Sequence, residues 1–153
     1  MNEPRLIDDP RITSFGRLVE AHAVLTKKLN DELEAAVGLP LLWFGVLLLV
    51  GRSPNGLRPM HEVTNATAFT SGGVTRLVDR MERAGYVDRR PCPRDRRVTY
   101  IGLTERGREM LDRATDVHLR GLQEHLMDAL EPEEIARLDP ILDKLRHVGA
   151  GNP

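Results

Sequence analysis

The stretch FTSGGVTRLVDRMERAGYVDRRPCPRDRRVTYIGLT, residues 69–104, decides the fold of this chain. Its first half predicts a helix, because apolar residues recur at steps of three and four over 74–81 before Gly85 ends the run. Thr70 precedes the apolar positions and is the predicted N-cap. The apolar residues share one face of this helix, and the arginines lie mostly off that face.

The second half of the stretch predicts a β-hairpin. One short strand opens at Tyr86, and a second strand over 98–103 is rich in β-branched and aromatic residues. Between them, PCPRD over 91–95 is a predicted loop. A helix that runs into an arginine-tipped hairpin is the layout of a winged helix-turn-helix.

The charge of residues 71–97 favours a polyanion as the partner. Eight arginines and no lysine stand against four acids there, so the segment carries a formal excess of four positive charges. The planar guanidinium suits phosphate oxygens, guanine edges and narrow minor grooves better than an ammonium does. The alternative is a solvated arginine-rich surface, which is how most charge runs turn out. The position of these arginines on a helix and a hairpin favours DNA.

Five motifs stand in order along the chain: VTRLVDRME at 74–82, AGYV at 84–87, RR at 89–90, DRR at 95–97 and LTERG at 103–107. In order and spacing they resemble the MarR family, the multiple-antibiotic-resistance regulators of bacteria, and the similarity spans nearly the whole chain. The resemblance implies an α-helical homodimer with one winged helix-turn-helix lobe in each subunit. It also implies sequence-specific DNA binding that a ligand or an oxidant relieves.

Helix-breaking residues divide the rest of the chain. A long amphipathic helix is predicted over 10–37 and is closed by Gly38, and a short buried helix follows, opened by Pro40 and ended by the turn 51–56. A short scaffold helix is predicted from Pro59 to about Ala66. Two further helices are predicted, a long one capped by Thr104 and a last one from Pro132. Pro140 lies inside the last pattern, so it should kink or split that helix.

The predicted fold class is mainly α with a small β-hairpin wing, in a single domain over 1–153. About 39–103 form the winged helix-turn-helix DNA-binding lobe, and about 10–37 and 104–148 form a helical dimerisation region. The helices of that region carry apolar stripes with no place in a small lobe. A two-fold dimer buries these stripes and presents two recognition helices to one face of a duplex. The alternative is a monomer whose terminal helices pack on each other.

The composition excludes several classes of protein. The formal net charge of −1 averages the basic segment with an acidic one, 105–139, whose ten acids against five arginines keep that part away from DNA. A single cysteine excludes a disulfide framework and a cysteine-rich zinc site. The polar N-terminus has no signal-peptide pattern, and the apolar run 39–50 is shorter than the roughly twenty residues of a membrane span. We expect a cytoplasmic protein with no membrane partner.

The recognition helix is expected to enter the major groove with its N-terminal residues facing base edges. The predicted DNA contacts on it are Thr70, Ser71, Gly72, Gly73, Thr75, Arg76 and Arg80. The two glycines have two explanations: they let the backbone approach phosphates or bases closely, or they are first-turn residues of slight cost and role. We favour the first, and it implies that recognition depends partly on DNA shape.

The hairpin loop is expected to be the second DNA contact. In the family, an aspartate followed two positions later by an arginine marks the hairpin, and Asp95 and Arg97 match that pattern. The resemblance implies that Arg97 reaches the minor groove while Asp95 orients it, with Arg94 and Arg96 beside them at phosphates. The alternative is a hairpin ion pair without a role in DNA binding, since an exposed pair contributes little to stability.

Enzyme, metal and cofactor classes find no support in the sequence. No GxSxG, P-loop or dinucleotide-binding motif occurs, and the five histidines include no pair at a tight metal-ligand spacing. His118 and His125 are seven residues apart, about two helical turns, which is too far to chelate directly. We therefore predict no enzymatic activity, no metal and no cofactor.

Two kinds of regulation are open. The resemblance implies a small aromatic or phenolic effector between the dimerisation helices and the DNA lobe, and by analogy His22 and Trp43 could line that site, although plain core packing explains both equally well. Redox sensing through Cys92, with the neighbouring arginines at 89, 90 and 94 activating the thiol, is the alternative. The chain has no second cysteine to resolve an oxidised one.

These observations together predict a transcriptional regulator, a repressor that binds a pseudo-palindromic double-stranded DNA operator as a homodimer. A winged-helix protein-interaction module without DNA binding is the alternative from another class. Such a module would not require the wing arginines or the Thr75-Arg76 step.

Overall fold

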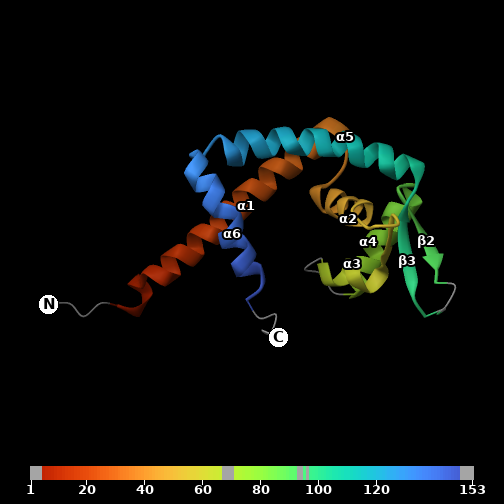
Figure 1. Cartoon of the computed structure of the whole chain (residues 1–153), viewed down its shortest axis with the longest axis horizontal. Helices are drawn as coiled ribbons and strands as arrows, with labels where there is room; N and C mark the ends of the chain where they lie inside the picture. Colours follow the sequence, from red (N-terminus) through yellow and green to blue (C-terminus); the bar gives the residue numbers. More distant parts are fainter. Residues whose placement is uncertain (1–4, 67–70, 93–94, 96, 149–153) are drawn as a thin grey trace. The chain divides into compact units, whose positions relative to one another are not determined.

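Helices and a small antiparallel sheet make up the computed structural model, which describes residues 5–66, 71–92, 95 and 97–148 (Figure 1). The chain divides into two units, which we call the lobe (Thr26–His118) and the terminal unit (Met1–Leu25 with Leu119–Pro153). The winged helix-turn-helix lies in the lobe.

The elements follow the predicted order along the chain. They are η1 (Leu6–Asp8), α1 (Pro10–Val37), α2 (Leu41–Gly51), β1 (Leu57–Pro59), α3 (Met60–Ala66), α4 (Ser71–Arg83), β2 (Val87–Pro91), β3 (Thr99–Leu103), α5 (Glu105–Leu122), the π-helical turn η2 (Gln123–Met127) and α6 (Pro132–Arg146). Gly38, at φ 67°, ends α1 as predicted, because glycine adopts this backbone conformation at little cost. The predicted N-cap Thr70 lies outside the described residues.

The three strands form one antiparallel sheet in the order β1-β3-β2. β2 and β3 are the predicted hairpin, with Val87 opposite Leu103. The sequence does not predict β1: its pattern places Pro59 in the first turn of α3, whereas Pro59 ends β1 opposite Tyr100. A three-residue strand is too short to show an alternating pattern, and β1 tolerates a proline because it is an edge strand.

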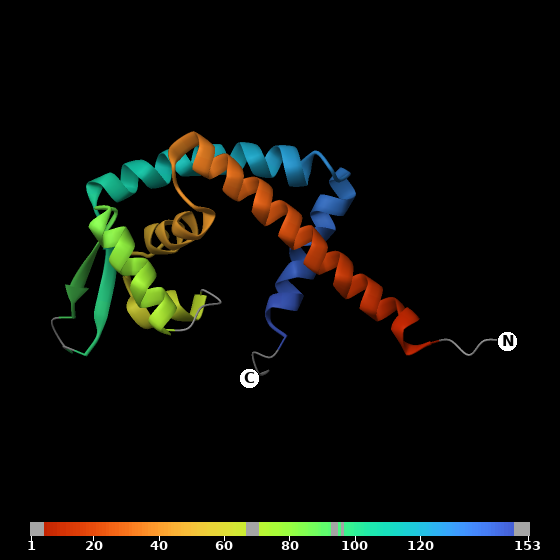
Figure 2. The ribbon, with the colours of Figure 1, turned by 180° about the vertical axis from the view of Figure 1, so that it is seen from behind.

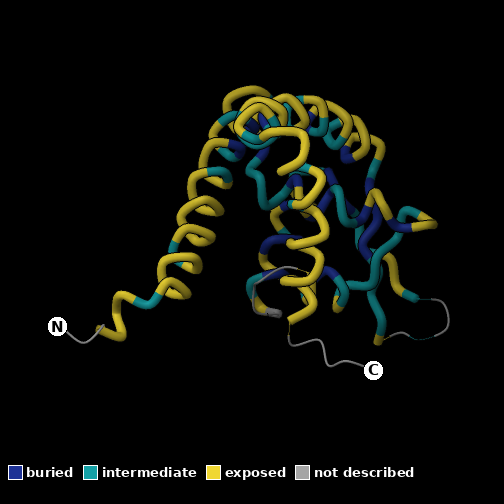
Figure 3. The backbone as a smooth tube through the Cα atoms, turned by 60° about the vertical axis from the view of Figure 1, so that its left-hand side comes forward, coloured by how far each residue is buried: buried dark blue, intermediate teal, exposed yellow. Residues whose placement is uncertain are grey.

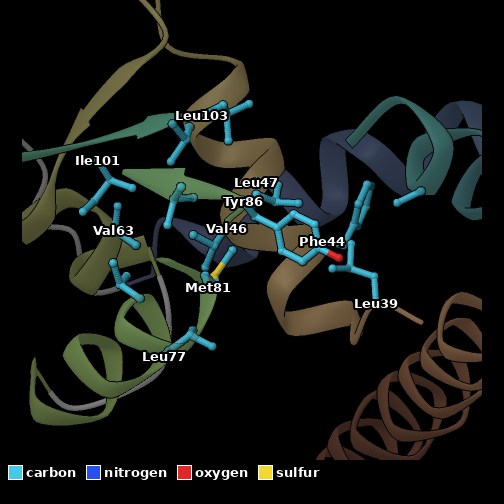
Figure 4. Close-up of a cluster of buried hydrophobic side chains, with 14 of the residues drawn as sticks. Leu39, Phe44, Val46, Leu47, Val63, Leu77, Met81, Tyr86, Ile101 and Leu103 are labelled. Carbon is cyan, nitrogen blue, oxygen red and sulfur yellow. The ribbon is translucent and has the colours of Figure 1, made fainter. Parts of the chain in front are cut away.

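The core of the lobe lies among α2, α3, α4 and the sheet. Side chains from all of these elements point into one cluster (Figure 4). α2 contributes Phe44, Val46, Leu47 and Val50, and only its two glycines are exposed. The predicted buried helix is therefore confirmed, and its apolar run follows from burial on nearly all sides. No single helix of the described chain is long and apolar enough to cross a membrane; α1 and α2 pass that test only as a pair bent by 84°.

The end of α4 and the start of α5 are joined by local hydrogen bonds. At Gly85, φ is 78°, and the Tyr86 N–H donates to the Met81 carbonyl at 3.0 Å, which closes α4 with a Schellman motif. Thr104 caps α5 as predicted, since its hydroxyl accepts from the Gly107 N–H at 2.9 Å and donates to the Gly85 carbonyl at 2.6 Å. One threonine therefore ties the start of α5 to the turn after α4.

The terminal unit buries no large apolar side chain among its described residues. All twelve exposed large hydrophobic residues of the described chain belong to it: Leu6, Ile7, Ile12, Phe15, Leu18, Val19, Val24, Leu119, Ile141, Leu142, Leu145 and Val148. Figure 3 shows the exposed backbone in yellow along the N-terminal part of α1 and along α6. The predicted stripes are present, and the described residues of the terminal unit form no apolar core around them.

α6 begins at Pro132, as predicted, behind a capping box formed by Glu131 and Glu134. The position of Pro140 inside the apolar pattern predicts a kink or a split in this helix. The helix continues through Pro140 to Arg146, so the proline does not split it. A proline inside a helix still removes one backbone hydrogen bond, which the rest of α6 tolerates.

Candidate nucleic-acid interface

α4 has an apolar face and a cationic face. Four apolar residues from Val74 to Met81 are buried in the core of the lobe, at the predicted steps of three and four. Arg76, Arg80 and Arg83 are exposed, and their spacing of four and three places them in one stripe along the helix. We call these three residues the arginine stripe. None of them takes part in an ion pair among the described residues, so their charges are available to an anion.

The arginine stripe borders a hollow of about 530 Å³ on the surface of the lobe. Leu42 of α2 and Leu77 of α4 supply apolar lining, and the three arginines and the carboxylate-bearing Asp79 line it as well. The cationic face of α4 is therefore concave on this side, not flat.

The register of the sheet explains where the arginines of β2 point. Val87 and Arg89 alternate with Asp88 and Arg90 along the strand, and side chains of a strand point to opposite faces in turn. Val87 and its partner Leu103 are buried in the core, so Arg89 shares the core-facing side of the sheet, where β2 lies beside α4 (Figure 2).

Arg89 binds both acids of α4 at once. Its guanidinium donates to the carboxylate of Asp79 at 2.5 Å and to the carboxylate of Glu82 at 2.5 Å. Its backbone N–H donates to Glu82 at 3.2 Å, and a further guanidinium contact reaches the Thr75 carbonyl at 3.4 Å. The side chain of Arg89 is only 26% exposed, so this pairing is better protected from solvent than an ordinary surface pair.

Arg90 has a local partner on the other face of the sheet. Its guanidinium donates to Asp88 of the same strand at 3.0 and 2.9 Å. These hydrogen bonds to the Asp88 carboxylate raise the pKa of Arg90. Arg89 and Arg90 are adjacent in sequence but serve different parts of the lobe.

The wing carries the predicted Asp95–Arg97 pair. The Asp95 carboxylate accepts from the backbone N–H of Arg97 at 3.0 Å and from its guanidinium at 3.2 Å. These hydrogen bonds, the backbone one first, hold the pKa of Asp95 below its ordinary value. The side chain of Arg97 is 92% exposed and is therefore free to reach a ligand. Arg94 and Arg96 lie outside the described residues.

The predicted contacts at the start of α4 lie in its first turns. Thr75 is exposed, and Gly72 is exposed with nothing within 4 Å of the position that a Cβ would take. Gly72 therefore has no packing requirement for glycine within the lobe. Gly73 is half-buried, and Ser71 begins the helix. Both explanations of the glycines remain compatible with this geometry, and the roles of these residues remain predictions.

The residues suggested for an effector site lie in different units. Trp43 is half-buried in the lobe and packs edge-on against Tyr86, with ring centroids 6.2 Å apart. The guanidinium of Arg106, a residue of α5, lies 5.2 Å from the centroid of the Tyr86 ring. His22 is exposed on the part of α1 that belongs to the terminal unit. Packing thus accounts for Trp43, and a ligand role for either residue remains a prediction.

Cys92 is the free cysteine that the redox alternative invokes. Cys92 is half-buried just after β2, where its backbone N–H donates to the Val98 carbonyl at 2.9 Å. Of the arginines expected to activate the thiol, Arg89 binds the acids of α4 and Arg90 binds Asp88. Each of these two guanidinium groups therefore already has a carboxylate partner, and redox sensing through Cys92 remains a prediction.

Sequence reasoning missed two side chains of the lobe. It counted Arg89 only as a positive charge, although the alternation Val87-x-Arg89 already indicates a core-facing side chain. It considered His118 only as a metal ligand, whereas the His118 ring packs on Phe44 with centroids 4.7 Å apart. Burial lowers the pKa of His118, and its Nδ1 has no hydrogen-bond partner. No local sequence signal identifies the packing of His118 on Phe44.

The MarR family model matches residues 37–98, which include α2 through β2. The chain is 33% identical over 102 residues to the uncharacterized HTH-type transcriptional regulator YkoM of Bacillus subtilis, over 66% of this chain and 64% of that protein. It is 29% identical over 136 residues to the multiple antibiotic resistance protein MarR of Escherichia coli, over 88% of this chain and 92% of that one.

A solved structure agrees with this chain over both units. Sco3205, a MarR family transcriptional regulator from Streptomyces coelicolor crystallised in complex with DNA, superposes with a TM-score of 0.84 at 27% identity. The superposition covers 96% of this chain and 92% of that one, so the similarity extends beyond the lobe.

Proposed function

We propose that this chain, which belongs to the MarR family and is a DNA-binding transcriptional regulator, represses transcription by binding a pseudo-palindromic operator as a homodimer. The observation that carries the proposal is the arginine stripe of α4, which is exposed and without an ion pair among the described residues. Three guanidinium groups in one row match the phosphates and guanine edges that line a major groove.

Two parts of the lobe divide the contacts. The start of α4, with Thr70, Ser71, Thr75 and Arg76, would face base edges, and Arg80 would hold the backbone. Gly72 and Gly73 would let the first turn of α4 approach the duplex. Arg97 of the wing, oriented by Asp95, would enter the minor groove with Arg94 and Arg96 at phosphates.

The apolar surface of the terminal unit supports the homodimer. A soluble protein rarely leaves so many large apolar side chains in water, and a second copy of the same unit covers them symmetrically. One hollow of about 660 Å³, lined by Leu18, Leu142 and Leu145 with charged residues of α6, lies in this surface. The dimer would place two copies of α4 on successive major grooves, about one helical turn apart. A protein that acts on DNA in this way would work in the cytoplasm.

Relief of repression by a small aromatic or phenolic acid is part of the proposal. Trp43 offers a half-buried indole at the edge of the lobe core, and aromatic ligands are usually held by such rings. The probe is benzoate, titrated into the protein–operator complex. Release of DNA by the parent, and a weaker response of Trp43→Leu at unchanged operator affinity, supports an effector site. Equal responses exclude Trp43 from it.

The DNA-binding function is tested by fluorescence anisotropy with a labelled duplex from the region flanking the gene of this protein. The expected result is binding that is roughly a thousand-fold tighter than to a random duplex of equal length. The slope of log affinity against log salt should be negative on both duplexes, because phosphate contacts release counterions. Equal affinity for both duplexes contradicts the operator. Absence of binding at low salt favours the protein-interaction module.

A further inference from the structure

The acids of α4 lie among the arginines that face the candidate DNA site. Asp79 stands three residues after Arg76 and four before Arg83, and side chains at these spacings pair readily on a helix. In the structure Asp79 pairs with neither arginine. Its carboxylate and that of Glu82 both bind Arg89, which comes from β2.

We propose that Arg89 is a positioning residue for DNA binding that masks the two carboxylates of the recognition helix. Asp79 lines the same hollow as the arginine stripe, and Arg89 neutralises its carboxylate together with that of Glu82, which leaves the arginine stripe to the phosphates. This inference rests on the proposed function, in which α4 is the element that binds DNA.

The geometry of the sheet allows Arg89, but not the adjacent Arg90, to bind the two carboxylates of α4. Arg89 lies on the core-facing side of the sheet, opposite the buried Ile101, so its guanidinium emerges beside α4. The planar fork satisfies one carboxylate with each of two nitrogens, which an ammonium does less well. Arg90 points from the opposite face and binds Asp88.

Loss of Arg89 would change the charge that DNA meets. Asp79 would then be free to pair with Arg76 or Arg83 at helix spacing. Each arginine captured in this way is lost as a phosphate contact, and the second freed carboxylate repels the duplex. The expected signature is weaker binding together with a shallower salt dependence.

The test is a cycle of variants measured by operator titration at several salt concentrations. Arg89→Gln should weaken operator binding roughly five-fold or more and reduce the salt slope by about one. The pair Asp79→Asn and Glu82→Gln should change binding little when Arg89 is present, because both charges are already masked. The same pair should restore most of the affinity and slope when it is added to Arg89→Gln.

Arg90→Gln is the matched control. It removes the same charge from the same strand but frees only Asp88. Neutralising Asp79 and Glu82 in the Arg90→Gln background should therefore raise operator affinity as little as it does in the parent. A uniform gain from Asp79→Asn and Glu82→Gln in all three backgrounds reflects general charge and overturns the masking role. Unaltered binding by Arg89→Gln overturns it too.

Folding and function are separated within the same experiment. Circular dichroism monitors each variant, and if Arg89→Gln fails to fold, Arg89→Lys replaces it in the cycle. A lysine keeps the charge and satisfies one carboxylate, so rescue by Glu82→Gln or Asp79→Asn is still expected and its absence overturns the inference. If the parent does not prefer the operator to a random duplex, the proposed function fails; if the parent prefers it and no coupling appears, only this inference fails.

Discussion

At the scale of single residues, the wing tip separates binding from stability. The Asp95–Arg97 pair is exposed and close in sequence, so it adds little to folding. The same exposure suits Arg97 for contact with DNA. One side chain can therefore be removed without disturbing the lobe.

We expect Arg97→Ala to weaken operator binding roughly five-fold or more while the melting temperature stays near that of the parent. Asp95→Ala should show part of the same loss, because Asp95 holds the backbone and side chain of Arg97. Anisotropy and thermal melts measure both effects. Cys92→Ser is the control and should bind as the parent does. If Arg97→Ala binds normally while Cys92→Ser loses affinity or an oxidant response, the DNA contact by Arg97 is contradicted and redox sensing through Cys92 is favoured.

Gly72 tests whether the backbone of α4 approaches DNA closely. Nothing within the lobe opposes a Cβ at this position, so Gly72→Ala should leave the stability of the free protein unchanged or slightly higher. We expect operator affinity to fall by roughly five-fold, about 1 kcal/mol, because the new methyl group meets the duplex. Gly45→Ala, an exposed helical glycine of α2 with the same open surroundings, is the control for both measurements. Unchanged affinity would show that Gly72 is an ordinary first-turn residue.

At the scale of elements, α5 starts against the turn that ends α4. A Cβ on Gly107 would lie 1.9 Å from the Tyr86 carbonyl oxygen, and backbone cannot yield as a flexible side chain does. The absence of a side chain at Gly107 is therefore what lets the first turn of α5 sit on the sheet end.

Gly107→Ala should lower the free energy of unfolding by about 1–3 kcal/mol, the usual cost of overpacking. Gly45→Ala makes the same chemical change in open space and should raise stability by about 0.5–1 kcal/mol through helix propensity. Urea titrations of both variants and the parent give the two values. A Gly107→Ala protein as stable as the parent would mean that α5 does not hold this close approach in solution.

The contact between α5 and α2 should make stability depend on pH. Burial lowers the pKa of His118 below its ordinary 6.5. Just below pH 6.5 the imidazole is therefore protonated in the unfolded chain but still neutral in the folded lobe. The stabilising contribution of neutral His118 is therefore complete above pH 6.5. It decreases as the pH falls below 6.5 and stops changing once the pH is below the lowered pKa of the folded lobe. His118→Leu should flatten this fall below pH 6.5, whereas substitution of the exposed His61 by leucine should keep it. Equal pH profiles for His118→Leu and the parent would contradict the assignment.

At the scale of the whole molecule, the exposed stripes of the terminal unit call for a partner copy. We expect light scattering to give a mass near twice the 17.2 kDa of one chain at micromolar concentration. Phe15→Glu combined with Leu142→Glu should shift the mass to one chain, because a charge cannot be buried in an apolar interface without a counterion. Operator affinity should fall with it, as two copies of α4 no longer bind together.

Thr13→Glu is the control for the dimer, since Thr13 lies on α1 away from the apolar stripe. It should keep the mass and the affinity of the parent. A parent that scatters as a single chain would instead favour terminal helices that pack on each other within one monomer.

The sequence by itself determined the parts of the fold that local chemistry specifies. The limits of α1, the buried α2, the caps at Gly85 and Thr104 and the wing hairpin all follow from residues within a few positions of one another. Periodicity, capping and turn preferences act over that range, so they can be recognised without coordinates.

Only the tertiary structure decided the contacts between distant segments. β1 exists because β3 pairs with it, and Asn30 of α1 caps α2 through the Leu41 N–H at 3.0 Å. Arg89 looks like one more positive charge in the sequence, yet across ten residues it binds Asp79 and gives α4 an uncompensated cationic face. Such pairings depend on which strand face and which helix face meet, and that is set by the packing of the whole lobe.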